Sequence, residues 1–245
     1  MEKIGIEGRG NFYDGVGALR DVGQNHVLQL LALITMDRPN SLNAEDVREA
    51  RVKTLNQLNT FTKTYRGQYS SYEGEVDVKK GSNTETYFKI LAEISSDRWR
   101  GVPIILEGGK KIEARKEVVV YFKHKTPCLC QGDTHYKNKI VFQIEPRESI
   151  TIDFWAKKPG LDFDMRKEKF NYLFRDQRKK IQFIEEYEKL LLDCIMGNQL
   201  LFVSTDEVSA MWRFIDPIIK LWDVNKVPLV KYKDLSKQLL KEEGF

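Results

Sequence analysis

Three short apolar runs decide how this chain folds: Val118–Phe122 (VVVYF), Ile140–Ile144 (IVFQI) and Ile150–Ala156 (ITIDFWA). They are rich in β-branched and aromatic residues, and turn-forming residues separate them, which is typical of β-strands. Two earlier runs, Thr86–Ile94 (TYFKILAEI) and Pro103–Leu106 (PIIL), have the same character. Because no helix-length segment separates most of these runs, parallel crossovers are scarce. The sequence therefore predicts a large, mostly antiparallel mixed sheet.

Helical patterns precede the strands. Apolar residues recur every three or four positions over Gly17–Met36, which predicts a largely buried helix that ends before Pro39. Asn43 is expected to cap a second helix, because acidic residues follow it in the first turn. This second helix is predicted to run to about Asn59. The segment Gln68–Asn83 is polar and lacks an apolar period, so it is predicted to be an exposed loop.

Helical patterns also follow the strands, over Ile184–Met196 and Thr205–Leu221. The second of these is expected to begin at an N-cap, Ser204 or Thr205, with Glu207 nearby. Strands grouped in the middle of a chain, with helices before and after them, indicate an α+β fold. The predicted architecture is a large, mostly antiparallel sheet with helices packed on one face.

Length and composition limit the function classes. The chain has 245 residues, of which 41% are hydrophobic, so residues 1–245 are expected to form one domain. The excess of basic over acidic residues is small, 40 against 36, and does not indicate a nucleic-acid-binding protein. The longest apolar stretch, Val27–Met36, is too short to cross a membrane. No secretory signal is recognisable, and three cysteines do not indicate a disulfide framework, so a cytoplasmic location is expected.

Two glycine-containing segments deserve comparison with phosphate-binding loops. Gly5–Gly10 (GIEGRG) lacks the residue order and the preceding strand of a dinucleotide-binding fingerprint, so a tight turn is the preferred interpretation. Gly108–Lys110 lacks the spacing of a P-loop. It can nevertheless place a lysine beside an anion, because glycines allow the backbone to come close to a ligand.

His26 is a candidate general base. It lies in a polar stretch of an otherwise apolar helix, close to Gln24, Asn25 and Asp21. A lone histidine in a helix often has a purely structural role. The accompanying carboxylate and amides favour a cleft, because buried polar groups need partners, and histidine is a common general base at neutral pH.

A metal site is an alternative role for another group of residues. His124, Cys128, Cys130 and His135 lie within twelve residues, but the cysteine spacing fits no standard zinc finger. The alternative is an ordinary loop with reduced thiols.

A set of short motifs, in one order along the whole chain, closely resembles the glucose-6-phosphate dehydrogenase family. The motifs are Glu7–Asp14 (EGRGNFYD), Gly17–Val22 (GALRDV), Gln24–His26 (QNH), Arg66–Tyr69 (RGQY), Asn83–Thr86 (NTET), Arg98–Trp99, Gly101–Pro103 (GVP), Gly109–Lys110, Ala156–Gly160 (AKKPG), Tyr187–Asp193 and Phe202–Trp212. The combination of Arg-Asp with Gln-Asn-His is the most specific part of the resemblance. It implies the family's C-terminal domain, in which a large antiparallel sheet forms the contact of a homodimer.

The resemblance also implies an activity and residue roles. The family oxidises glucose 6-phosphate to 6-phosphogluconolactone with NADP in the oxidative pentose phosphate pathway. His26 corresponds to the general base that takes the proton of the sugar's C1 hydroxyl. Glu2, Asp21 and Lys110 correspond to groups that contact the sugar. Arg115 stands where many members carry a second basic residue for the substrate.

The sequence departs from the family pattern in two ways. The N-terminal half, with its Rossmann glycine loop for NADP, is not present, so a separate Rossmann half is an expected partner. A second, structural NADP site is not expected either, because Glu107, Gln143, Glu145 and Asp153 stand where members with such a site carry basic or amide residues. Acidic residues there would repel a dinucleotide phosphate.

Three hypotheses of function follow. The first is the substrate-binding and dimerisation part of an NADP-dependent dehydrogenase, inactive without a cofactor domain. The second is a non-catalytic phosphosugar-binding module derived from that enzyme, and the third is a dimerisation scaffold. The presence of Glu2, Asp21, His26 and Lys110 together favours the first, because a scaffold would not need all four.

Overall fold

The structure is a computed structural model that describes residues 1–123, 136–162, 164–174 and 186–233. The chain divides into two compact units. The first unit contains Met1–Glu113 and Ile184–Phe245, and the second contains Ala114–Phe183. Each unit has its own four-stranded sheet. The predicted α+β class with mostly antiparallel strands is confirmed, and the strands form two hydrogen-bonded sheets where a single one was expected.

The sheet of the first unit has the strand order β3-β2-β1-β8. Its strands are β1 (Leu58–Tyr69), β2 (Tyr87–Ile94), β3 (Ile104–Gly109) and β8 (Leu229–Tyr232). Strands β1, β2 and β3 are antiparallel neighbours, whereas β8 pairs with β1 in parallel. The predicted strands at 86–94 and 103–106 are confirmed as β2 and β3.

The helices of the first unit agree only partly with the predictions. They are α1 (Gly10–Tyr13), the π-helix η1 (Leu19–Val27), α2 (Leu28–Thr35), α3 (Ala44–Asn56), the short 3₁₀ helix η2 (Tyr72–Gly74), α4 (Glu186–Met196) and α5 (Thr205–Asp223). The predicted helix over Gly17–Met36 is confirmed, although its first half is π-helical. The second helix ends at Asn56, and Leu58 already belongs to β1.

Both predicted N-caps are present. The side chain of Asn43 accepts a hydrogen bond from the Asp46 N–H at 2.8 Å. Ser204 and Glu207 form a capping box at the start of α5, in which each side chain accepts a hydrogen bond from the other's backbone N–H. These local contacts satisfy backbone donors that a helix start would otherwise leave without partners.

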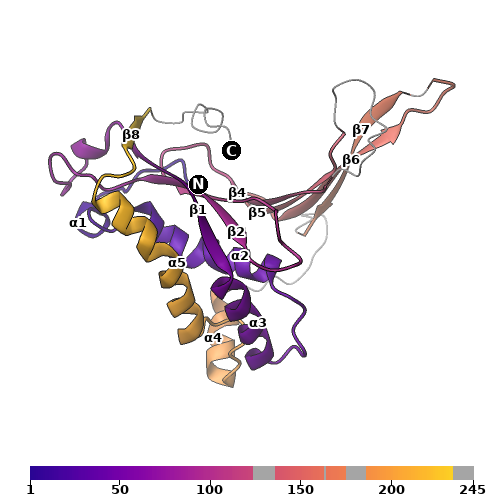
Figure 1. Ribbon diagram of the computed structural model, residues 1–245, viewed down its shortest axis with the longest axis horizontal. Coiled ribbons are helices and arrows are strands. Elements are labelled where there is room, and N and C mark those ends of the chain that lie inside the picture. The colour runs from indigo at the N-terminus through magenta and orange to yellow at the C-terminus, as the bar shows by residue number, and fades with distance from the viewer. Residues whose placement is uncertain (124–135, 163, 175–185, 234–245) are drawn as a thin grey trace. The chain divides into compact units, whose positions relative to one another are not determined.

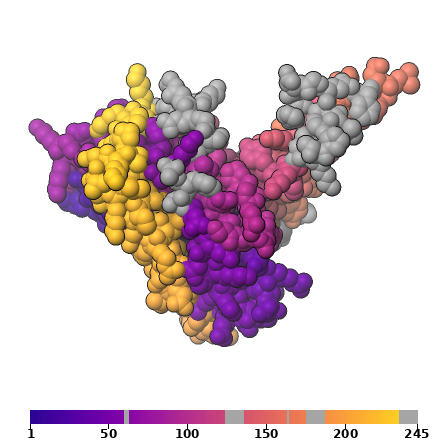
Figure 2. All heavy atoms as spheres, in the orientation of Figure 1, coloured from indigo at the N-terminus to yellow at the C-terminus, as the bar shows by residue number. Residues whose placement is uncertain are grey.

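The main core of the first unit lies between the sheet and the helices α2, α3 and α5, which share one side of β1 and β2 (Figure 1). Its buried side chains include Leu28, Leu55, Phe88, Ile90 and Phe214. Figure 2 shows the golden surface of α5 running along the violet surface that includes α3. Helices packed on one face of the sheet were predicted, and the first unit confirms this.

A second core consists mainly of tyrosines. It contains Tyr13, Tyr69, Tyr72, Tyr87 and Tyr232, all buried, together with Ile6 and Ile112. The prediction of an exposed loop over Gln68–Asn83 is therefore wrong for the first part of that segment. The polar composition was misleading because the segment contributes only a few buried side chains, among them Gln68, Tyr69 and Tyr72.

The sheet of the second unit has the order β4-β5-β6-β7 and is entirely antiparallel. Its strands are β4 (Lys116–Tyr121), β5 (Lys139–Glu145), β6 (Ser149–Lys157) and β7 (Met165–Leu173). The three runs quoted first thus form β4, β5 and β6. The register places Val118, Phe142, Ile150 and Tyr172 side by side. Because side chains alternate along a strand, one face of this sheet is mostly apolar.

Within the described ranges, no helix has the length and apolar character needed to span a membrane.

Candidate functional site

The helix η1 brings two of the expected site residues onto one side. Asp21 and His26 are five positions apart, a spacing that an α-helix would place on different faces. In a π-helix, residues five apart lie one turn apart and stack above each other. At the end of η1 the Leu28 N–H bonds to the Gly23 carbonyl, five residues earlier, as this geometry requires.

Two glycines let η1 lie close to the sheet. A Cβ atom at Gly23 would lie 2.9 Å from the ring of Phe88, and one at Gly108 would lie 2.7 Å from the same ring. Both distances are shorter than van der Waals contact, so the ring of Phe88 fits only between two glycines. This packing brings η1 next to the end of β3, where Lys110 follows.

Glu85 holds the start of η1. Its carboxylate accepts a hydrogen bond from the Leu19 N–H at 3.0 Å, and its backbone carbonyl accepts one from Ala18. Gly17 has a positive φ of 77°, and a Cβ atom there would lie 2.3 Å from the Glu85 carboxylate. Burial of Glu85 raises its pKa to about 7. Glu85 thus binds the backbone at the start of η1, and Gly17 leaves room for its carboxylate.

Lys110 is the centre of the charged cluster. Only 3% of the residue is exposed, and its Nζ lies 2.8 Å from Glu2 Oε2 and 3.8 Å from Asp21 Oδ2. The ammonium also lies 5.4 Å from the centre of the Tyr13 ring, which is within the range of a cation–π interaction. Glu2, Tyr13 and Asp21 therefore meet at the buried positive charge of Lys110, which is distant from them in the sequence.

Backbone hydrogen bonds position Glu2 beside Lys110. The Glu2 N–H donates to the Gly109 carbonyl at 2.9 Å, and the Ile112 N–H donates to the Glu2 carbonyl at 3.0 Å. The first residues of the chain thus run alongside the segment that follows β3. This explains how a residue at position 2 can join a site with residues 21 and 110.

His26 lies at the surface, unlike Lys110. Its imidazole is exposed, and in the described part of the chain no side chain forms a hydrogen bond with its ring. The backbone N–H of His26 is bound by the side chain of Asn25. The structure places His26 on the same helix side as Asp21 and leaves its ring accessible.

Arg115, the fifth expected site residue, belongs to the second unit. Its guanidinium lies 3.5 Å from a carboxylate oxygen of Glu117.

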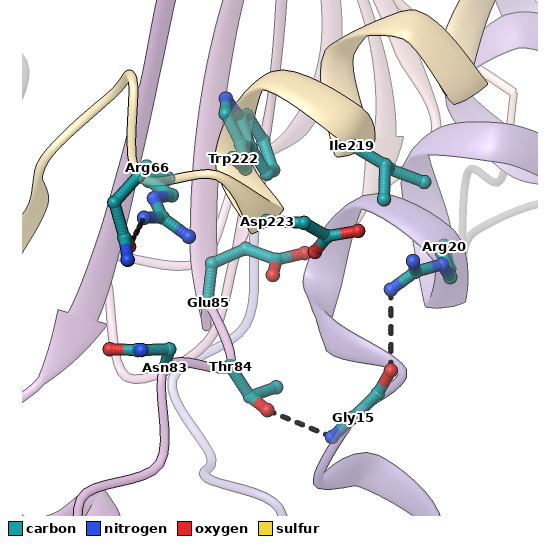
Figure 3. Close-up of a pocket in the computed structure, with 10 residues that line it drawn as sticks. Gly15, Arg20, Arg66, Asn83, Thr84, Glu85, Ile219, Trp222 and Asp223 are labelled. Atoms are coloured by element: carbon teal, nitrogen blue, oxygen red, sulfur yellow. Dashed lines mark hydrogen bonds between the residues drawn. The ribbon is translucent and has the colours of Figure 1, made fainter.

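A cavity of about 190 Å³ lies beside the start of η1 (Figure 3). Arg20, Arg66, Glu85 and Asp223 contribute charged groups to it, and Trp222 contributes an apolar wall. Figure 3 shows Glu85 between the two arginines. Arg66 is buried and donates hydrogen bonds to the Val227 carbonyl and to Asn225. None of the expected site residues lines this cavity, which instead surrounds the Glu85 carboxyl.

The glycine segment near the start of the chain forms a turn, as preferred. Glu7 and Gly8 both have positive φ values. Gly10 packs against the backbone of another loop, because a Cβ atom there would lie 2.0 Å from the Val76 carbonyl oxygen. Gly10 is therefore required for the close approach of two loops.

The possible metal ligands His124, Cys128, Cys130 and His135 lie outside the described residues. Within the described ranges, no group of three or more histidine, cysteine, aspartate or glutamate side chains is arranged to hold a metal ion.

Residues 1–241 match the family model described as "Glucose-6-phosphate dehydrogenase, C-terminal domain". The chain belongs to the glucose-6-phosphate dehydrogenase family. It is 37% identical over 254 residues to a glucose-6-phosphate 1-dehydrogenase of Buchnera aphidicola subsp. Schizaphis graminum, covering 94% of this chain and 52% of that protein. It is 33% identical over 253 residues to the Arabidopsis thaliana protein named "Glucose-6-phosphate 1-dehydrogenase 5, cytoplasmic", covering 100% of this chain and 49% of that protein.

Solved structures of glucose-6-phosphate dehydrogenases have the same fold. One, described as a complex with its substrate glucose 6-phosphate, is 31% identical and has a TM-score of 0.88 over 98% of this chain. Another, from Mycobacterium avium, is 30% identical and has a TM-score of 0.82 over 96% of this chain. This chain covers 52% and 51% of those two structures, respectively, so it spans about half the length of its relatives.

Sequence reasoning missed three residues that build this site: Tyr13, Glu85 and Tyr232. Tyr13 and Glu85 lie within the quoted motifs, so the resemblance could have indicated them. No local signal marks Tyr232, whose hydroxyl donates to the carbonyl of Lys110, 122 positions away, at 2.7 Å.

Proposed function

We propose that residues 1–245 are the substrate-binding and dimerisation domain of an NADP-dependent glucose-6-phosphate dehydrogenase of the cytoplasm. The observation that carries this proposal is the meeting of Glu2, Asp21 and Lys110 beside the helix side that presents His26. Asp21, His26 and Lys110 lie within the family motifs, and the resemblance implies a substrate contact or the base for all four residues. Arg115 is proposed as a further contact to the substrate.

The cluster suits a phosphorylated sugar. A buried ammonium and two carboxylates can donate to and accept from sugar hydroxyls, and charge-assisted hydrogen bonds are stronger than neutral ones. His26 is accessible and can remove the proton from the C1 hydroxyl as a general base. When that proton leaves and the C1–H electron pair departs as hydride, the C1–OH becomes the lactone carbonyl. The share of this chain in the reaction is to hold the sugar and accept the proton.

The described residues do not form a binding site that fits NADP, the hydride acceptor. The backbone of Val76 fills the space beside Gly10. In the described ranges, no glycine loop connects a strand to the start of a helix in the manner of a Rossmann fold. At the positions of the structural NADP site found in some members, Asp153 is paired with Lys139 and Lys167, and Glu145 with Lys116. We therefore place NADP on a Rossmann half, which corresponds to the part of the relatives that this chain does not match.

Binding of glucose 6-phosphate tests the site directly. In isothermal titration calorimetry, Lys110→Met should weaken binding about tenfold or more, because it keeps the aliphatic stem but removes a charge-assisted hydrogen bond. Lys111→Met is the matched control: its Nζ lies 3.5 Å from Glu75 and it should bind like the unchanged chain. Equal affinities of all three proteins would contradict the role of Lys110, and absence of binding would contradict the proposed substrate.

Activity tests the role of His26. The chain alone should not reduce NADP, because hydride transfer requires the two reactants to be held together at about 3–3.5 Å. A fusion of the Rossmann half of the Buchnera relative to Met1 should give activity, and His26→Asn should abolish it without changing the melting temperature. NADP reduction by the chain alone that His26→Asn abolishes would show that the cofactor binds here.

A further inference from the structure

Lys110 is held by its backbone as well as by its charge partners. Its N–H donates to the Thr86 carbonyl at 2.9 Å. Its carbonyl accepts a hydrogen bond from the hydroxyl of Tyr232 at 2.7 Å. Both the N–H and the carbonyl of Lys110 have partners. The Cα atom that carries its side chain is therefore fixed relative to β2 and β8.

The Tyr232 hydroxyl is itself held in place by its surroundings. Tyr232 is 4% exposed, and its oxygen lies 2.9 Å from Thr86 Oγ1. The pairing of β8 with β1, in which Tyr232 lies opposite Tyr69, sets the position of its backbone. The strand that carries this hydroxyl comes from the far end of the chain.

The ring of Tyr232 belongs to the tyrosine core. It packs edge to face against Tyr69 and Tyr87, with ring centres 6.4 and 6.0 Å apart. Tyr69 contacts Tyr72, and Tyr72 contacts Tyr13, the ring beneath the Lys110 ammonium. A single packed cluster therefore supports both the backbone and the ammonium of Lys110.

We propose that Tyr232 is a positioning residue for Lys110: its hydroxyl holds the Lys110 carbonyl so that the buried ammonium faces Glu2, Asp21 and a bound phosphosugar. This inference rests on the proposed function of Lys110 as a sugar contact. The energetic reason is preorganisation, since a lysine already held in its binding position loses less freedom when the ligand binds.

Tyr232→Phe tests the proposal because it keeps the ring and removes only the hydroxyl. We expect affinity for glucose 6-phosphate to fall about fivefold, the effect of one neutral hydrogen bond. Tyr87→Phe is the matched control, because Tyr87 is also buried and packs on Tyr232, but its hydroxyl donates to Glu107. Its affinity should stay within about twofold of the unchanged chain. An equal loss in both variants, or no loss in Tyr232→Phe, would overturn the proposal.

A double-mutant cycle distinguishes positioning from a general loss of structure. If Tyr232 acts through the Lys110 ammonium, Tyr232→Phe should have no further effect on affinity in a Lys110→Met background. Fully additive losses would overturn the proposal. Should Tyr232→Phe fail to fold, as judged by circular dichroism, Thr86→Val takes its place in the cycle, since it removes the oxygen beside the Tyr232 hydroxyl.

A second measurement does not depend on the sugar. Reductive methylation of Lys110, followed by peptide mass spectrometry, should be several times faster in Tyr232→Phe than in the unchanged chain or in Tyr87→Phe. If the unchanged chain does not bind glucose 6-phosphate, the proposed substrate is wrong, but the labelling rates still test whether Tyr232 positions Lys110. Equal labelling rates in all three proteins would overturn that part as well.

Discussion

Glu85 is a buried carboxyl group whose ionisation should affect the stability of the first unit. Burial raises its pKa to about 7 in the folded chain, above the usual value of 4.5. Between pH 4.5 and 7 the folded state keeps a proton that the unfolded state loses, so the free energy of unfolding decreases as pH rises through this window.

Replacement of Glu85 by glutamine should remove this pH dependence. The amide stays neutral, and its oxygen can still accept from the Leu19 N–H. Urea unfolding at pH 5 and pH 8 should show Glu85→Gln gaining about 2–3 kcal/mol relative to the unchanged chain at the higher pH. Glu73→Gln serves as a control: a hydrogen bond from Lys231 lowers the pKa of Glu73 from its usual value of 4.5, so its ionisation contributes almost no pH dependence between pH 5 and pH 8, and this variant should keep the pH dependence of the unchanged chain. A parallel pH dependence of unchanged chain and Glu85→Gln would refute the assignment.

The hydroxyl of Tyr13 is buried and has no hydrogen-bond partner in the described part of the chain. An unsatisfied buried hydroxyl costs free energy, whereas a phenylalanine ring would keep the cation–π contact with Lys110. Tyr13→Phe should therefore stabilise the chain by about 1 kcal/mol, visible as a melting temperature about 2–4 °C higher. Tyr72→Phe should do the reverse, because the Tyr72 hydroxyl donates to Asp14 at 3.1 Å. A lower melting temperature for Tyr13→Phe would indicate a partner for its hydroxyl.

At the scale of the elements, a buried ion pair joins α3 to α5. Arg51 Nε lies 2.7 Å from Glu207 Oε1, and both side chains are almost fully buried. Arg51 also donates to the Phe202 carbonyl just before α5 begins. Removal of one partner of a buried pair leaves an uncompensated charge, which costs more than the pair itself contributes.

Arg51→Met should therefore destabilise the chain by about 3–5 kcal/mol in urea unfolding. Glu207→Gln keeps the capping box and removes only the charge. The double variant should lose clearly less than the sum of the two single changes, since neither charge is then left alone. Lys53→Met is a control on the same helix: its pair with Asp37 is more than half exposed, so the change should be within about 0.5 kcal/mol. Additive losses at Arg51 and Glu207 would mean that the two charges do not interact.

At the scale of the whole molecule, the sheet of the second unit needs a partner for its apolar face. Phe142, Phe154, Phe170 and Tyr172 lie on this face and are between 36% and 56% exposed. No helix of the described chain belongs to that unit. Apolar patches of this kind mark interfaces in soluble proteins, and a second copy of the same sheet is the partner that we propose.

Light scattering should accordingly give twice the chain mass of 28.6 kDa at micromolar concentration. Phe142→Lys should give the monomer mass, because it places a charge in the interface. Gln143→Lys lies on the opposite face of the same strand and should leave the dimer intact. A monomer mass for the unchanged chain would refute the dimer, and equal effects of the two lysines would place the interface elsewhere.

Local patterns in the sequence determined the parts of this protein that depend on neighbouring residues. The β-branched runs became β2 to β6, and the N-caps at Asn43 and Ser204 mark the starts of α3 and α5. Strand propensity, helix periodicity and capping act over a few residues, so one sequence is enough to recognise them. The family motifs added the candidate site residues, including His26 and Lys110.

Strand β1 shows what depended on the tertiary structure. It lies inside its sheet although it contains Arg66 and Gln68, which are buried. Their polar groups are satisfied by Val227 and Asn225 and by the carbonyls of Ser82 and Thr84. A polar residue looks exposed in the sequence when its partner is distant, so this strand could not be predicted.

The site itself also required the tertiary structure. The resemblance named Glu2, Asp21 and Lys110, but only the folded chain brings them together at one ammonium, through the first residues of the chain, the π-helix and the segment after β3. The close packing of the π-helix on the sheet depends on Phe88 fitting between Gly23 and Gly108. The sequence determined which chemical groups are available, whereas packing between distant segments decided which of them meet, because these contacts join residues about twenty to more than one hundred positions apart.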